Sequence, residues 1–156
     1  GDIIEGLSDL FAQALEAKNI KLELIDTSGN ASFVVNKSGF RNHVLVNLIS
    51  NAIKFSPVGG RVVVEVSAGQ KLVLFKIIDQ GLGMNEILSR SIFDISQPTT
   101  RLGTMGEKGT GFGLPIVKSF VDKSGGSIDV CSRPTEEYPH NSGTTFTISL
   151  TRCSDT

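Results

Sequence analysis

The sequence predicts an α+β fold, a two-layer α/β sandwich in which a mixed, largely antiparallel sheet carries helices on one face. In several segments apolar residues recur at three- and four-residue spacing, which is the period of an amphipathic helix. In other segments they alternate with polar residues or run together, which is typical of strands. Two of those strands follow each other through a short polar turn, as in a hairpin. Helices intermixed with hairpin-linked strands favour this class.

Length and composition set the outer limits. The chain has 156 residues, 39% of them hydrophobic, which suits one compact domain over 1–156 with its own core. The net charge of −1 predicts no nucleic-acid partner. Cys131 and Cys153 are too few for a disulfide framework or a zinc site, which favours a reducing compartment. Without a signal peptide or a bilayer-spanning apolar run, we expect a soluble, cytoplasmic piece of a longer protein that can be anchored in a membrane.

The first part of the chain alternates helices with short strands. We expect, in order, a lead-in helix over 2–17, a strand over 20–24, a short strand over 33–35 and a long helix over 38–55. Asp2 is placed to cap the first helix, and Asn36 or Ser38 to cap the long one.

The second part begins with a hairpin. Its expected elements are strands over 61–67 and 71–79, a short helix around 86–93, a helix over 115–124, strands over 127–132 and 144–150, and a frayed tail over 151–156. The 71–79 strand is apolar at nearly every position, so it should be central in the sheet. Residues 80–114 are rich in glycine and lack a lasting period, which is typical of a functional lid or binding loop.

The long helix has one polar stripe. At 100° per residue His43, Asn47, Asn51 and Lys54 share one side, opposite the apolar positions. Asparagine is a poor helix former, yet two asparagines lie one turn apart. An amide oxygen can ligate a hard cation, and a lysine one turn later can contact phosphate oxygens. Taken alone, the stripe is explained equally well as an ordinary exposed helix face.

Two glycine motifs follow. In the stretch from Asp79 to Met84, a carboxylate after a buried strand can accept the exocyclic amine of adenine, and Gly81 and Gly83 let the backbone approach a flat ligand. Alone, this motif is more often a simple tight turn. The second motif runs over 106–114 into the next helix, where glycines at alternate positions and a helix N-terminus favour an anion. It is neither a P-loop nor a Rossmann turn.

Together these residues carry a resemblance. The ordered motifs are Asn47 with Asn51-Ala52-Ile53-Lys54-Phe55, Asp79-x-Gly81-x-Gly83, Phe93, Gly109-Thr110-Gly111-Phe112-Gly113-Leu114 and Gly143-Thr144-Thr145-Phe146. The set resembles the N, G1, F and G2 boxes of the catalytic and ATP-binding domain of sensor histidine kinases. That domain belongs to the GHKL superfamily, which includes gyrase, Hsp90 and MutL. The resemblance covers nearly the whole chain and implies a Bergerat-type ATP-binding fold.

The resemblance implies roles for individual positions, with ATP and Mg²⁺ as the bound species. Asn51 is expected to ligate the magnesium, with Asn47 as its partner on the helix. Asp79 is expected to bind the adenine amine, and Thr145 to reach adenine through water. The full expected ATP-binding set is Asn47, Asn51, Lys54 (phosphate), Phe55 (adenine wall), Asp79, Gly81, Gly83, Met84, Lys108, Gly109, Thr110, Gly111, Phe112, Gly113, Leu114 and Thr145. A mobile lid is expected from about Phe93 to Gly111.

Asn47 also indicates the reaction. ATPases of the superfamily carry a glutamate there to activate water, and an amide lacks that basicity. The resemblance therefore implies phosphoryl transfer to a histidine on a separate dimerisation domain, and then to a response regulator receiver domain. Neither His43 nor His140 lies in such a domain, so we expect no catalytic acceptor in this fragment, which should bind ATP without autophosphorylating. The alternatives are a GHKL-type ATPase, a serine-directed kinase, or a degenerate nucleotide-sensing interaction module.

Overall fold

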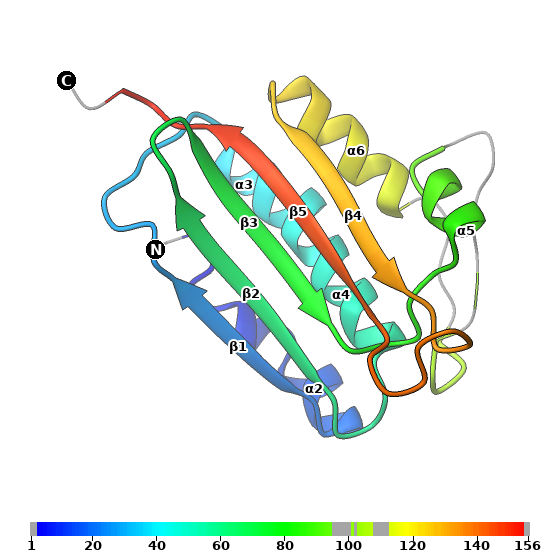
Figure 1. Ribbon diagram of the computed structural model, residues 1–156. Coiled ribbons are helices and arrows are strands. Elements are labelled where there is room, and N and C mark those ends of the chain that lie inside the picture. Colours follow the sequence, from blue (N-terminus) through cyan, green and yellow to red (C-terminus); the bar gives the residue numbers. More distant parts are fainter. Residues whose placement is uncertain (1–2, 95–100, 102, 108–112, 155–156) are drawn as a thin grey trace.

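The computed structural model describes residues 3–94, 101, 103–107 and 113–154. The described strands form one five-stranded sheet in the order β1-β2-β3-β5-β4 (Figure 1). Their bounds are β1 Lys21–Asp26, β2 Arg61–Ala68, β3 Leu72–Asp79, β4 Ser127–Arg133 and β5 Gly143–Thr151. Strand β1 pairs with β2 in parallel, and all the other pairings are antiparallel. The predicted mixed, largely antiparallel sheet with a central 71–79 strand is confirmed.

The helices form the second layer. They are α1 Leu7–Leu10, α2 Ala12–Lys18, α3 Lys37–Gly39, the π-helix η1 Phe40–Leu45, α4 Val46–Phe55, α5 Glu86–Ser91 and α6 Gly113–Lys123. Figure 1 shows α2, α3, α4 and α6 behind the same face of the sheet, as the two-layer prediction requires. Within the described ranges, no helix has both the length and the apolar character needed to cross a membrane.

The core lies between the two layers. Every second residue of β2, β3 and β5 faces the helices and is buried: Val62, Val64, Val66, Val73, Phe75, Ile77, Phe146, Ile148 and Leu150. The apolar side of α4 meets them with Leu48, Ile49, Ala52 and Ile53. Phe75 lies at the centre, 5.0 Å between ring centroids from Phe40. Burial of one such ring is worth roughly 2–3 kcal/mol, so this contact helps to hold η1, which leads into α4, on the sheet.

Three predicted elements differ from the structure. The tail predicted to fray from 151 is paired at its start, because Thr151 belongs to β5 and the amide of Cys153 donates to the carbonyl of Ser32 at 2.7 Å. The single helix over 2–17 is wrong, because Gly6 is left-handed (φ 78°) before α1 and Phe11 leaves helical geometry between α1 and α2; Asp2, its expected cap, lies outside the described residues. The 33–35 strand reduces to one bridge, from Phe33 to Arg152. The remaining predicted strands and the 86–93 and 115–124 helices lie within about two residues of the observed bounds.

The helix predicted over 38–55 is present in three parts. Asn36 is the cap, since its Oδ1 accepts from the amide of Gly39 at 2.7 Å. Helix α3 passes into η1, whose wider π-type turns change the phase of the helix before α4 begins. The predicted amphipathic character of α4 is confirmed, because Asn47, Asn51 and Lys54 are only half-buried and their apolar neighbours are buried.

Candidate nucleotide-binding site

Asp79 is the last residue of the central strand β3, and only 7% of it is exposed. Its Oδ1 accepts from the amide of Gly81 at 2.8 Å, and the amide of Thr144 donates to the same carboxylate. Burial raises the pKa of Asp79 to about 6, although the two amides and the charge of Arg101 act in the opposite direction. A carboxylate has about four acceptor positions, so two amide bonds leave room for a ligand amine.

The structure places Thr144, and not Thr145, beside Asp79. Register pairs Asp79 with Thr144 and Ile78 with Thr145. Neighbouring side chains of a strand point to opposite faces, so Thr144 lies on the face of Asp79 and Thr145 lies on the face away from the helices. Thr144 is 7% exposed, and its Oγ1 is 2.8 Å from Ser132 Oγ. Thr144 is therefore the threonine on the face of Asp79, as the period of two before buried Phe146 could have indicated, and the role of Thr145 toward adenine stays a prediction.

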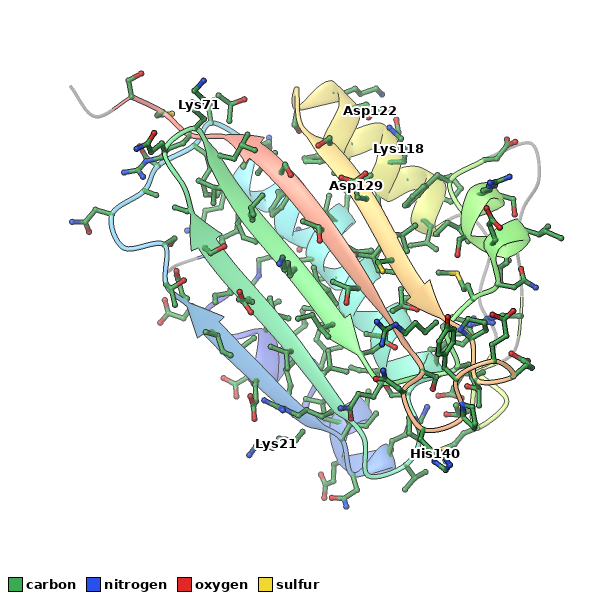
Figure 2. The ribbon with its side chains drawn as sticks, viewed as in Figure 1. Lys21, Lys71, Lys118, Asp122, Asp129 and His140 are labelled. Carbon is green, nitrogen blue, oxygen red and sulfur yellow. The ribbon has the colours of Figure 1, made fainter. Side chains whose placement is uncertain are left out.

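The turn after Asp79 is held from both sides. Three carbonyls of the turn accept hydrogen bonds: Gly81 from Ser142 Oγ (2.7 Å), Leu82 from Thr135 Oγ1 (3.0 Å) and Gly83 from Arg101 Nη2 (2.7 Å). The Leu82 amide donates to the carbonyl of Phe55, at the end of α4. Ser142 and Thr135 come from the loop between β4 and β5, which Figure 2 marks with the exposed His140. Sequence reasoning missed this support, because the loop carries no motif.

The two glycines of the turn are required by backbone packing. A Cβ on Gly81 would lie 2.4 Å from the carbonyl oxygen of Phe55. A Cβ on Gly83 would lie 1.9 Å from the carbonyl oxygen of Arg133, and Gly83 also has a φ of 65°. These contacts give the two glycines a packing role, because only a residue without a Cβ fits there; the room they make for a base stays a prediction.

The polar side of α4 presents two amides one turn apart. Asn47 Nδ2 donates to the carbonyl of His43 at 2.6 Å, which leaves Oδ1 on the side of Gly113, at the start of α6. Asn51 follows and is also half-buried. Among the described residues, no three His, Cys, Asp or Glu side chains cluster as metal ligands. Neutral amide oxygens, completed by phosphate oxygens and water, nevertheless form a donor set that suits magnesium.

Two cations meet at the ring of Phe55. Arg101 Cζ lies 4.4 Å and Lys54 Nζ 5.0 Å from its centroid. Burial lowers the pKa of Lys54, with Glu107 opposing and Arg101 adding to the effect. Burial also lowers the pKa of Arg101, against the charges of Glu136 and Asp79. Both shifts have the direction of cations that lack full compensation, which is a favourable place for an anion.

The other predicted residues divide into three groups. Met84 is buried, and its amide donates to Ser132 Oγ at 2.8 Å, so it belongs to the turn. Gly113 and Leu114 begin α6 and are half-buried. The predictions for Lys108, Gly109, Thr110, Gly111 and Phe112 lie outside the described residues. Phe93 packs edge-on against Phe146, with centroids 6.2 Å apart.

The site therefore combines a buried acceptor, a fixed turn, an amide pair and two cations at one end of the sheet. A family model described as "Histidine kinase-, DNA gyrase B-, and HSP90-like ATPase" matches residues 36–153. The chain belongs to this family. Within it, the similar proteins described next identify the chain as a catalytic and ATP-binding domain of the sensor histidine kinase type.

Among curated proteins, the sensor protein KdpD of Clostridium acetobutylicum is 40% identical over 96 residues, covering 58% of this chain and 10% of that protein. Among solved structures, the catalytic domain of histidine kinase ThkA superposes with a TM-score of 0.78 at 22% identity, covering 96% of this chain and 92% of that one. The mycobacterial sensor histidine kinase MprB reaches 0.72 at 26% identity, covering 96% and 97%. The catalytic domain of a histidine kinase is thus similar in fold to this chain over almost its full length.

Proposed function

We propose that this chain, as one domain over residues 1–156, binds ATP with magnesium and directs its γ-phosphoryl group to a histidine on a separate dimerisation domain of the same protein. The observation that carries the proposal is Asp79, a buried carboxyl at the end of the central strand with Thr144 beside it. The ionised carboxylate accepts the adenine amine, and Thr144 lies where it can reach the base through water. Phe55 offers a flat wall close to the same turn.

Charge and amides support the phosphate end of this proposal. Lys54 and Arg101, at the Phe55 ring, are the proposed contacts of the triphosphate, whose negative charge would offset the burial of both cations. Asn47 and Asn51, one turn apart on α4, would hold the magnesium through their amide oxygens, and the magnesium would supply neutralisation of phosphate charge. Full-length ShkA, whose ATP-binding part is 22% identical to this chain, has been solved with AMPPNP.

The proposed reaction is transfer to protein and not hydrolysis. Asn47 already donates its amide hydrogen to the His43 carbonyl and has no basic group to take a proton from water. His43 and His140 are both exposed, and neither is proposed as the acceptor. This chain positions and neutralises the triphosphate, and it binds ATP without phosphorylating itself.

The remaining partners belong to the whole protein. The chain spans 10% of the length of KdpD, so the acceptor domain and the sensor are proposed to lie in other parts of the protein. A response regulator receiver domain is the proposed final acceptor. In support, histidine kinase ThkA, 21% identical to this chain, has been solved with the response regulator TrrA. The proposed location is the cytoplasmic part of a sensor that can be membrane-anchored.

Calorimetric titration with a non-hydrolysable ATP analogue, with and without magnesium, tests the proposal. The wild-type chain is expected to bind, and magnesium to strengthen binding. Asn51→Ala should lose most of the magnesium-dependent gain, about tenfold or more, and keep the magnesium-free affinity, because Asp79 is untouched. Asn42→Ala, which removes an exposed amide on the same helical segment, is the control and should change neither value.

Two results would count against the proposal. A folded wild-type chain that does not bind the analogue would favour an interaction module. Steady release of phosphate from ATP that disappears in Asn51→Ala would favour hydrolysis over transfer.

A further inference from the structure

Lys18, the last residue of α2, is buried with 3% exposure, although it is far along the chain from every motif of the site. Its Nζ contacts four oxygens: the carbonyls of Ile53 (2.8 Å) and Lys54 (3.0 Å), Thr104 Oγ1 (2.5 Å) and Glu107 Oε2 (2.9 Å). A lysine is almost never this buried unless its charge is paired and its donors are used. All three ammonium hydrogens have acceptors here.

Two of the four contacts lie at the C-terminal end of α4. The last carbonyls of a helix have no partner within the helix, and a positive charge there is favourable. Lys18 therefore stabilises the end of the helix that carries Lys54 and Phe55. By these two contacts alone, Lys18 would be a structural cap that another helix supplies to α4.

The other two contacts are to residues 103–107, which form a compact turn. The amide of Gly103 donates to the carbonyl of Glu107 at 2.9 Å, and the amide of Met105 donates to Glu107 Oε1 at 2.7 Å. The turn rests on the end of α4, because the amide of Thr104 donates to the carbonyl of Lys54 at 3.0 Å. The turn lies so close to the end of α4 that a Cβ on Gly103 would be 2.4 Å from the carbonyl oxygen of Lys54.

Glu107 connects the turn to Lys18 by charge. Partial burial alone would raise the pKa of Glu107, but the hydrogen bonds from Lys18 and from backbone amides hold it below its usual value. The charge of Glu107 also acts to raise the pKa of Lys54, against the effect of burial. One ion pair thus joins α2, the end of α4 and the 103–107 turn, whose near neighbour Arg101 lies over Phe55.

We propose that Lys18 is a positioning residue for nucleotide binding: through Glu107 and Thr104 it holds the 103–107 turn against the end of α4, beside Lys54 and Phe55. The ligand class rests on the function proposed above. A segment that is already held in place loses less conformational freedom when a triphosphate binds beside it, so affinity is higher. Lys18 itself touches no nucleotide, because its three donors are engaged.

A double-mutant cycle separates this role from simple capping. Lys18→Met, Glu107→Gln and the double variant are titrated with the same magnesium-bound ATP analogue, next to wild type. Lys18→Met should weaken binding about tenfold or more, and Glu107→Gln by a smaller factor in the same direction. The double variant should bind about as weakly as Lys18→Met, because both changes break one link. Lys21→Met is the control, since Lys21 lies at the surface on β1 (Figure 2).

Hydrogen exchange provides the readout on the turn itself. In Lys18→Met and in Glu107→Gln, the amides of Gly103 and Thr104 should exchange faster than in wild type, and the amides of β3 should keep their protection. Glu107 is only half-buried, so its variant tests the proposal even if Lys18→Met does not fold.

The outcomes are distinct. If the wild type binds and Glu107→Gln, or folded Lys18→Met, binds equally well or more tightly, the positioning role is overturned and the proposed function stands. Losses that simply add in the double variant would also overturn it, because Lys18 would then act on α4 alone. If the wild type does not bind the analogue at all, both proposals fail together.

Discussion

Asp79→Asn is expected to weaken binding of an ATP analogue about 100-fold or more, and to gain stability relative to the wild type as pH rises. The amide puts an NH₂ group in place of one carboxylate oxygen. Two backbone amides and the proposed adenine amine all require acceptors at this side chain, so one donor must face another. Sites built around such a hydrogen bond lose affinity steeply when it is removed.

The stability effect follows from the raised pKa. A carboxyl whose pKa is higher in the folded than in the unfolded chain contributes stability that is complete below the unfolded value and is lost as pH rises through the folded value. For Asp79 these values are 3.8 and about 6. The difference is worth roughly 3 kcal/mol between about pH 4 and pH 7, which the wild type loses and the variant does not.

Urea unfolding at pH 4, 5.5 and 7 measures the free energy of unfolding, and calorimetric titration at pH 7 measures the affinity for the ATP analogue. The variant's free energy of unfolding should rise relative to wild type across this range. Asp129→Asn, at an exposed carboxyl on β4 (Figure 2), is the control for the titration and should leave affinity unchanged. A difference in the free energy of unfolding that does not change with pH would show that burial does not raise the pKa of Asp79. An unchanged affinity would show that Asp79 does not contact the nucleotide.

Gly83→Ala should be the most damaging single-methyl change in the turn. The residue has a φ of 65°, which costs an alanine about 1 kcal/mol or more. The added Cβ would also lie 1.9 Å from the carbonyl oxygen of Arg133, and backbone atoms can move away only if the end of β4 shifts. We expect a total loss of about 3 kcal/mol or more in the free energy of unfolding, with loss of nucleotide binding.

Gly125→Ala is the matched control for this prediction. Gly125 follows α6 with a φ of 75°, but nothing lies within 4 Å of its Cβ position. It should lose only the conformational part, about 1 kcal/mol, and keep nucleotide affinity. Equal losses in the two variants, measured by urea unfolding, would show that the close approach to Arg133 is relieved without cost.

Much of the fold was predictable because its signals are local. Near-continuous apolar residues placed β3 at the centre, and the cap at Asn36 follows from a side chain that accepts from a backbone amide. The interruption of the first helix was not predictable, since Gly6 and Phe11 leave helical geometry inside a pattern that keeps its period. The π-type turn was missed for a similar reason, because it changes the phase of a helix without changing its composition.

The site was predictable where one residue carries the chemistry and not where tertiary contacts do. The position of Asp79 at the end of a buried strand follows from the apolar run before it, and its predicted role toward adenine came from the resemblance of the ordered motifs. The resemblance implied Thr145, whereas the strand's period of two places Thr144 on the face of Asp79. The supports from Thr135, Ser142 and Lys18 depend on which loops meet in space, and sequence spacing does not encode that.

The pairing of β3 with β5 closes a long loop, because residues 80–142 connect the two strands. That connection contains the turn after Asp79, α5, α6 and β4. The entropy of closing a loop grows only with the logarithm of its length, about 0.6 kcal/mol for each doubling. The connection between α5 and α6 can therefore be lengthened by many residues at little cost in loop-closure entropy, while the pairing of β3 with β5 stays the same.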